Sequence, residues 1–152
     1  MTMTTRPRYL DPDCPLTLAE GLAEFAACNP DLVPAEDPAL REFIRAHDSC
    51  HVLFGLTTSI EDEALADTWT ILGSTIPTRQ YAGYLKHEAV MNIVREAGAR
   101  ALIRGTLRAV PRALRVIWRA RQMTAKWPFF DYAAHLGTPI AELRRRYGVR
   151  PV

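Results

Sequence analysis

The sequence predicts an all-α protein: a single domain of about six helices within residues 1–152, with residues 1–15 as an extended N-terminal segment. Three observations predict this class. Apolar residues recur at helical spacing along most of the chain, helix caps and breakers separate the periodic stretches, and the alternation typical of strands is absent. A chain of 152 residues is long enough to bury one hydrophobic core.

Two helices are expected in the first third of the chain. The pattern T-x-x-E at 17–20 is a capping box that starts a helix, and the sequence N-P-D-L-V-P at 29–34 ends it. Asp37 followed by Pro38 is typical of an N-cap and first turn. The helix that they start is expected to run to about Phe54 and to stop at the glycine that follows.

Four further helices are expected in the rest of the chain. The first is capped by Thr58 or by Ser59 and reaches about Ser74. The other three are expected at about Arg79–Ala99, 101–123 and 139–147. The helix expected at 101–123 is basic, and Pro111 is expected to kink it.

Charge divides the chain into two unlike parts. Residues 1–85 contain thirteen acidic and five basic side chains, whereas residues 89–126 contain nine basic side chains and Glu96 as the only acidic one. The second part is therefore expected to face an anionic ligand or an acidic partner surface. Nucleic acid is not expected, because no zinc-finger spacing or ribonucleoprotein motif is present.

The cysteines and the N-terminus bear on the compartment. Three cysteines without framework spacing favour a reducing compartment over a disulfide-linked secreted domain. The N-terminal residues lack the apolar core of a signal peptide, and no apolar stretch is long enough to cross a bilayer. A soluble or peripheral protein is expected.

The second expected helix directs two histidines toward the interior. At about 100° per residue, His47 and His51 lie about 40° apart on the apolar face, and Asp48 lies at the edge of that face. Rings one turn apart on the same face can reach a single metal ion. Because a buried imidazole without a partner costs about 1–3 kcal/mol, each ring needs a metal or a hydrogen bond.

Several assignments stay open on the residues alone. The two histidines are either metal ligands or core residues that bond main-chain carbonyls. Glu63 lies opposite the apolar residues of its helix, so periodicity makes it a solvent-facing residue. It becomes a ligand if that helix has two buried faces or begins by pointing back toward the histidines. Cys50, also on the buried face, is better interpreted as a small apolar residue than as a sulfur ligand.

The stretch HDSCHVLFGLTTSIEDE has the form H-D-x-x-H, eleven residues and E, made by His47, Asp48, His51 and Glu63. It resembles the signature of the coenzyme Q biosynthesis protein four family, the mitochondrial ubiquinone-assembly protein and its bacterial relatives. Gly55, the tract WRARQMTAK at 118–126 and the tract TPIAELRRRYGV at 138–149 are also similar to that family. Asp62 stands where relatives often carry glycine, and the chain is shorter than the mitochondrial members.

The resemblance implies a protein that binds a divalent metal through His47, Asp48, His51 and Glu63, with Asp48 either a ligand or a residue that orients a histidine. The implied metal is zinc, or iron or manganese where oxidation is required. The implied activity is ubiquinone biosynthesis, by metal-dependent oxidative decarboxylation at ring carbon one of a polyprenyl-benzoate precursor. The alternative is a non-catalytic prenyl-lipid-binding scaffold that organises the quinone-biosynthesis complex. A generic helical metallohydrolase is the third hypothesis, and the absence of an evident general base disfavours it.

The basic helix has two interpretations. It is either a core helix with a solvated arginine face or a helix that lies on a membrane, with Trp118 and the aromatic residues at 127–130 at the interface. In the second case its arginines bind anionic head groups or the head group of a lipid substrate. The expected lipid or head-group residues are Arg112, Arg115, Arg119 and Trp118.

The partners follow from the resemblance and from this second interpretation. They are a prenylated quinone precursor or isoprenoid lipid, other quinone-biosynthesis proteins and a peripheral membrane surface. The expected location is the cytoplasm, in peripheral association with the inner (cytoplasmic) membrane. A homodimer is compatible with a small helical domain.

Overall fold

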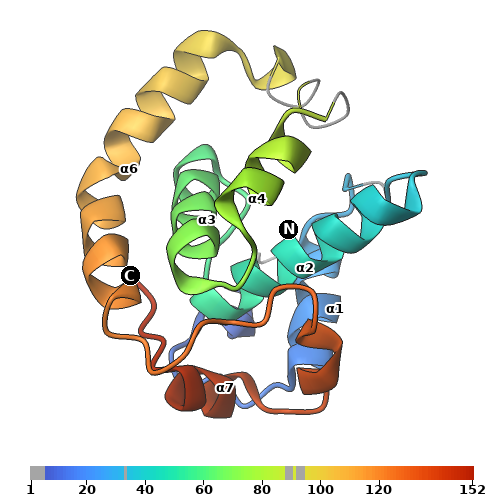
Figure 1. Ribbon diagram of the computed structural model, residues 1–152, viewed down its shortest axis with the longest axis vertical. Coiled ribbons are helices and arrows are strands. Elements are labelled where there is room, and N and C mark those ends of the chain that lie inside the picture. Colours follow the sequence, from blue (N-terminus) through green and yellow to red (C-terminus); the bar gives the residue numbers. More distant parts are fainter. Residues whose placement is uncertain (1–5, 33, 88–90, 92–94) are drawn as a thin grey trace.

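The computed structural model describes residues 6–32, 34–87, 91 and 95–152, and every regular element among them is a helix (Figure 1). Two isolated β-bridges, Thr17 with Pro139 and Ser74 with Trp127, are the strand-type pairings in this part of the chain. The prediction of an all-α protein is confirmed. The helices are η1 (Arg8–Leu10), α1 (Leu18–Cys28), α2 (Pro38–Phe54), α3 (Ile60–Gly73), α4 (Thr78–Leu85), α6 (Ala99–Ala120), η2 (Tyr132–His135) and α7 (Ile140–Tyr147).

The ends of α1, α2 and α3 are set by the residues that the sequence marks. Thr17 and Glu20 form the capping box of α1, each accepting a hydrogen bond from the other's main-chain N–H. Asp37 caps α2, and Gly55 ends it in the left-handed conformation with a φ of 71°. Of the two candidate caps for α3, Ser59 is the one whose side chain accepts a main-chain N–H.

One predicted helix is wrong in its continuity. The helix expected over Arg79–Ala99 is interrupted after Leu85, where the N–H of Lys86 bonds the carbonyl of Gly83 in a tight terminal turn, and residues 91 and 95–97 are again helical. Residues 88–90 and 92–94 of the predicted helix lie outside the described residues. Gly98, with a φ of 82°, precedes the start of α6. Beyond it, α6 runs as one continuous helix through Pro111.

Helix α3 occupies the middle of the molecule, with α2 on one side and α6 on another (Figure 1). The aromatic ring of Phe54 on α2 stacks on Trp69 of α3, with ring centroids 4.5 Å apart. On the other side, Gly105 of α6 lies so close to α3 that an added Cβ would stand 2.5 Å from Cγ2 of Ile60. Because α3 has neighbouring helices on more than one side, polar side chains of α3 can face another helix instead of solvent.

No helix among the described residues combines the length and the hydropathy needed to cross a bilayer.

Candidate metal centre

Two helix ends joined by a short turn bring the histidines and Glu63 together. His47 and His51 lie in the last two turns of α2, and the chain reverses through the left-handed Gly55. Ser59 then starts α3, and Glu63 lies in its first turn. The α3 start therefore points back toward α2, which is one of the two arrangements that makes Glu63 a candidate ligand.

Three potential ligand atoms converge on one point. Nε2 of His47 lies 3.2 Å from Nε2 of His51. Oε2 of Glu63 lies 3.5 Å from the first of these nitrogens and 3.4 Å from the second. Ligands held about 2.0–2.1 Å from a tetrahedral ion are separated from one another by about 3.3 Å. The triangle of donors therefore has the size of one face of such a coordination sphere, and the group could hold a metal ion.

The interpretation of the histidines as core residues bonded to main-chain carbonyls does not describe this site. The Nε2 atoms of both rings face each other and Glu63, and no main-chain oxygen among the described residues bonds either ring. The rings are held by aromatic packing instead: Phe43 stacks on His47 and Phe25 lies against His51. The donors are therefore positioned by the fold before any ion binds.

The charges of the site suit a cation. Burial opposes ionisation of Glu63, yet hydrogen bonds from His47 and His51 hold the pKa of its carboxyl far below its usual range. Burial likewise opposes protonation of His47, but the Glu63 carboxylate raises the pKa of that ring above its ordinary value. Without metal, a proton on the imidazole supplies the positive charge that an ion would supply when bound.

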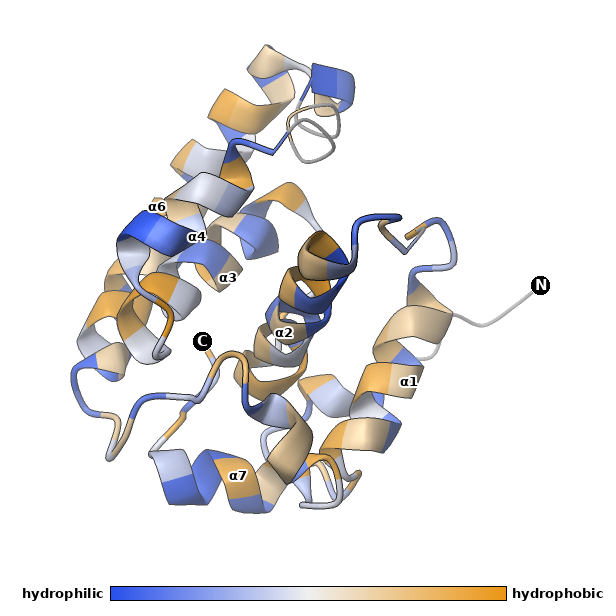
Figure 2. Cartoon of the chain, turned by 45° about the vertical axis from the view of Figure 1, so that its right-hand side comes forward, coloured by the Kyte–Doolittle hydropathy of each residue, from blue (hydrophilic) through white to orange (hydrophobic). Residues whose placement is uncertain are grey.

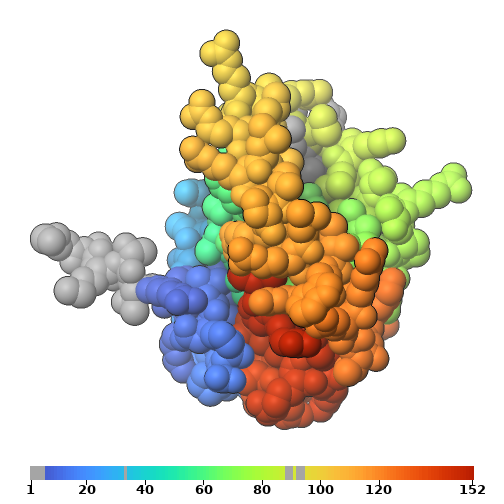
Figure 3. Space-filling model, turned by 90° about the vertical axis from the view of Figure 1, so that its left-hand side faces the viewer, coloured from blue at the N-terminus to red at the C-terminus, as the bar shows by residue number. Residues whose placement is uncertain are grey.

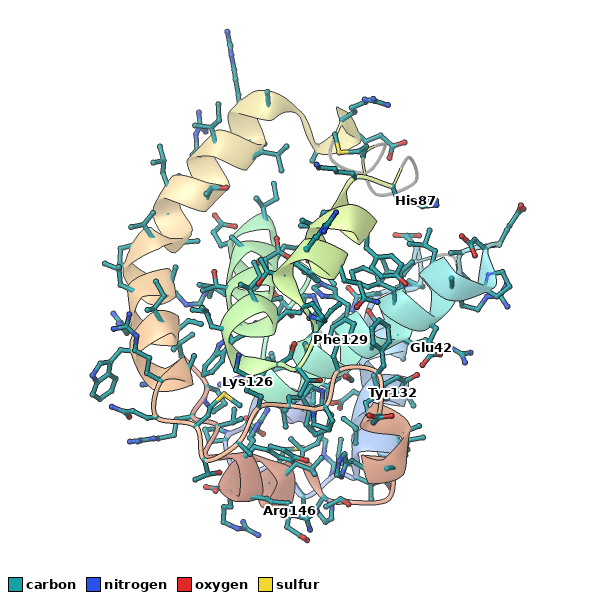
Figure 4. All side chains as sticks on the ribbon, viewed as in Figure 1. Glu42, His87, Lys126, Phe129, Tyr132 and Arg146 are labelled. Carbon is teal, nitrogen blue, oxygen red and sulfur yellow. The ribbon has the colours of Figure 1, made fainter. Side chains whose placement is uncertain are left out.

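A second set of residues orients the His47 ring. The hydroxyl of Tyr81 on α4 lies 3.4 Å from Nδ1 of His47 and donates its proton to Oδ1 of Asp67 on α3. This arrangement favours a proton on Nδ1, which leaves the lone pair of Nε2 directed at the converging point. The ring of Phe129 packs edge-on against that of Tyr81. Phe129 lies in the segment that follows α6 and is labelled in Figure 4.

Sequence reasoning missed both outer partners. Asp67 lies one turn after Glu63 on the same face of α3, and burial raises the pKa of its carboxyl. That spacing was an available signal for Asp67. Nothing in the local sequence indicates Tyr81, because α4 reaches the site only through the tertiary fold.

The structure places Asp48 and Cys50 outside the group of converging donors. Asp48 lines a hollow between α1, α2 and η2, together with Arg45 and Tyr132, and burial raises the pKa of its carboxyl to about 6. No hydrogen bond joins Asp48 to either ring in the described structure, so its proposed role as a ligand or as an orienting residue stays a prediction. Burial raises the pKa of Cys50 to about 12, in agreement with its interpretation as a small apolar residue.

A set of two histidines and one carboxylate leaves coordination positions open. Catalytic zinc sites use three protein ligands with one position for water or substrate. The same donor set, with open positions on one side, is typical of non-haem iron(II) oxygenases. The residues therefore fit a catalytic ion of either kind better than a closed structural zinc site with four protein ligands.

The four residues expected to bind lipid or a head group have different surroundings. Arg112 forms an ion pair with Asp62 at 2.6 Å and bonds the carbonyl of Val152. Arg119 bonds the main-chain carbonyls of Arg150 and Pro151. These two arginines hold α6 to α3 and to the C-terminal residues.

Arg115 and Trp118 are exposed. The other aromatics expected at a membrane interface include Trp127 and Phe129, which are buried, so that expectation is wrong for them.

The pH dependence of metal binding follows from the raised pKa of His47. Ligation requires a neutral ring, so the apparent affinity for zinc is expected to fall as the pH is lowered through that pKa, by up to about tenfold per pH unit. In the metal-free protein the sign is opposite: the protonated His47–Glu63 pair stabilises the fold below the raised pKa and is lost as the pH rises through it. Chelator-competition titrations between about pH 8 and about pH 5.5 measure the first effect. An affinity independent of pH over this range would contradict the assignment of His47 as a ligand.

Substitution of Tyr81 with phenylalanine tests the outer partners. The variant keeps the ring that packs against Phe43 and Phe129 but removes the hydroxyl that orients His47. Metal affinity is expected to fall about 10-fold to 100-fold, the usual range for loss of such a partner. Isothermal titration with zinc measures the change, and Tyr84→Phe, on the same helix, is the matched control. Equal affinities for the wild type and Tyr81→Phe would show that the hydroxyl does not orient the ligand.

Comparisons of the chain with protein-family models, with curated proteins and with solved structures each found no match.

Proposed function

We propose that this chain is a metal-dependent protein of prenylated quinone biosynthesis, which catalyses oxidative decarboxylation at ring carbon one of a polyprenyl-benzoate precursor. The observation that carries the proposal is the convergence of His47, His51 and Glu63 at the spacing of a coordination sphere with open positions. The resemblance of the 47–63 stretch to the coenzyme Q biosynthesis protein four family supplies the substrate class.

The proposed reaction has a definite balance. The bond between ring carbon one and the carboxylate breaks and releases carbon dioxide, and a bond from the same carbon to a hydroxyl oxygen forms. Dioxygen supplies that oxygen atom, and a two-electron reductant with protons converts the other one to water. A bound metal ion would supply a Lewis acid for the carboxylate and a site for dioxygen.

In this chemistry the residues of the site would hold the metal ion and keep the histidine rings oriented toward it. Glu63 contributes the negative charge that retains a divalent cation, since its carboxyl is ionised throughout the neutral pH range. His51 is almost fully buried, so its ring cannot rotate away from the converging point without disturbing the packing against Phe25. Tyr81 and Asp67 keep the Nδ1 proton of His47 in place.

The test uses the purified full chain reconstituted under anaerobic conditions with iron(II), manganese(II) or zinc. A polyprenyl-hydroxybenzoate labelled with ¹³C in the carboxylate is then added with dioxygen and ascorbate. Release of labelled carbon dioxide, with formation of the hydroxylated ring detected by mass spectrometry, is the expected result. It is expected with at least one redox-active metal and is expected to be absent for Glu63→Gln.

The scaffold alternative predicts a different outcome in the same assay. The labelled precursor would bind but would release no carbon dioxide, and binding would be unchanged in Glu63→Gln. Removal of metal would then affect only thermal stability. That combination of results would reject the catalytic proposal and favour the non-catalytic prenyl-lipid carrier.

A further inference from the structure

Helix α6 presents its large apolar side chains to the outside of the molecule. They recur at intervals of three or four residues, so they form one stripe along the helix, and they are 45–66% exposed. Figure 2 shows apolar and polar segments alternating along this helix. We call these five residues the apolar stripe: Ile103, Leu107, Val110, Leu114 and Trp118.

The opposite face of α6 makes the contact with the body of the protein, and its residues are small. Gly105, Ala109 and Val116 are the buried residues of the helix. Arg112 pairs with Asp62, the largely exposed Arg108 lies 3.9 Å from Glu61 of α3, and Arg119 bonds the C-terminal carbonyls. A helix of a globular protein normally buries its large apolar residues, so α6 is oriented opposite to the usual arrangement. The apolar stripe is therefore not the edge of the hydrophobic core, because it lies on the side of α6 that faces away from the body of the protein.

The exposed stripe is large for a monomer. Its five side chains together expose on the order of 500 Å² of apolar surface, near the upper end of what a soluble monomer shows in one patch. Figure 3 shows α6 running along one side of the molecule as a ridge that other elements leave uncovered for most of its length. A patch of this size and continuity marks an interaction surface.

Arginines adjoin the stripe on one flank and identify its partner. Arg100, Arg104, Arg108 and Arg115 are exposed, and Arg100, Arg104 and Arg108 line a shallow hollow together with Ile103 and Leu107 of the stripe. A second copy of the chain docked along the stripe would place two rows of arginines beside each other, and their repulsion disfavours that pairing. An anionic lipid surface instead accepts the apolar side chains below the head groups and neutralises the arginines.

We propose that α6 docks the protein on an anionic membrane, with the apolar stripe inserted among the lipid head groups and the arginine flank bound to lipid phosphates. The stripe from Ile103 to Trp118 extends over about 22 Å of helix, so α6 lies parallel to the membrane plane. Trp118 near the C-terminal end of the helix takes the interfacial position that tryptophan favours. The long arginine side chains reach from the helix flank to the phosphates.

Vesicle flotation with the purified full chain tests the docking. The probes are vesicles of phosphatidylcholine alone and vesicles with about 30% phosphatidylglycerol. The wild type is expected to partition at least about tenfold more strongly onto the anionic vesicles, and raising the salt from about 0.1 M to about 0.5 M is expected to reduce this preference. Absence of binding to both kinds of vesicle would overturn the proposal.

Substitutions within the apolar stripe distinguish docking through α6 from non-specific binding to vesicles. The double variant Leu107→Ser with Leu114→Ser is expected to lose binding at least about tenfold, because it removes two exposed apolar side chains without touching the core. Leu32→Ser, which changes another exposed leucine away from α6, is the matched control and is expected to bind as the wild type does. Equal binding of the double variant and the wild type would overturn the proposal.

Tryptophan fluorescence gives a readout from the stripe itself. Trp69 and Trp127 are fully buried, so a change on adding vesicles reports mainly Trp118. A blue shift, and quenching by lipids brominated near the head of the acyl chain, are expected for the wild type. Trp118→Phe is expected to bind vesicles but to lose both signals. Binding without any change in Trp118 fluorescence would place the contact elsewhere on the protein and would overturn the proposal.

Other occupants of the stripe give distinct results. Sedimentation that shows a dimer, converted to monomer by the double variant without vesicle binding by either form, would make the stripe a self-association surface and overturn the proposal. The outcome is independent of the proposed function, because protein treated with a metal chelator is expected to bind vesicles as well as untreated protein does. Failure of the decarboxylation assay therefore leaves the docking result unchanged.

Discussion

Substitution of His51 with alanine is expected to abolish stoichiometric metal binding. The wild type, purified without chelator or reconstituted with zinc or iron(II), is expected to carry about one ion per chain. His51 supplies one of three converging donors and is almost fully buried, so its truncation leaves two donors in the group. Loss of a direct ligand is expected to lower affinity by more than the 10-fold to 100-fold typical of outer partners. Elemental analysis by mass spectrometry, with chelator-competition titrations, measures both quantities.

Two further variants make this measurement specific. His87→Ala removes a histidine on the surface, where its ring lies 3.9 Å from Asp37, and is expected to retain the ion. Asp48→Asn tests the fourth residue of the motif, and retention of the ion is expected because its carboxylate lies outside the converging group. A wild type without metal after reconstitution would contradict the centre altogether. Loss of metal in Asp48→Asn would instead show that the side chain joins the site on binding.

The sequence was sufficient to place the two histidines together but not to place the third candidate ligand beside them. Spacing of four residues within one helix places His47 and His51 on the same face whatever surrounds that helix. Glu63 belongs to another helix, so its position depends on the turn at Gly55 and on the register of α3. Periodicity assigns Glu63 to a solvated face because a helical wheel assumes a single buried side, whereas α3 contacts both α2 and α6. The position of Tyr81 at the site depends on the path of α4, a third helix.

Periodicity also could not predict which side of α6 faces the protein, because it does not show which elements surround a helix. Its sequence shows clearly that apolar residues share one side and arginines another, and the helix was predicted. Periodicity does not say whether the apolar side meets the core or the surroundings. The deciding residues are Gly105 and Ala109, whose small size allows α6 to approach α3 closely on the side opposite the stripe. Their role becomes evident only when the facing helix is in place.

Arg144 of α7 is expected to have a large effect on stability, because it is a buried cation whose hydrogen bonds, among the described residues, all go to main-chain oxygens. Its guanidinium donates to the carbonyls of Val52 and Leu53 at the end of α2. It also donates to three carbonyls of the N-terminal segment, those of Tyr9, Asp11 and Pro12. Burial lowers the pKa of Arg144 to about 10, so the side chain remains protonated at neutral pH. One side chain therefore joins the C-terminal helix, the N-terminal segment and the end of α2.

Arg144→Ala is expected to lower the free energy of unfolding by at least about 3 kcal/mol, because several buried carbonyls lose their donor at once. For a chain of this length that corresponds to a fall in Tm of roughly 6–12 °C. Arg144→Lys is expected to restore only part of the loss, since one ammonium group cannot reach carbonyls spread across a planar fork. Thermal and urea unfolding followed by circular dichroism measure the change, with the exposed Arg145→Ala as the control, expected to lie within about 0.5 kcal/mol of the wild type. A similar small effect for Arg144→Ala would mean that solvent satisfies these carbonyls and that the three segments are held together by apolar packing alone.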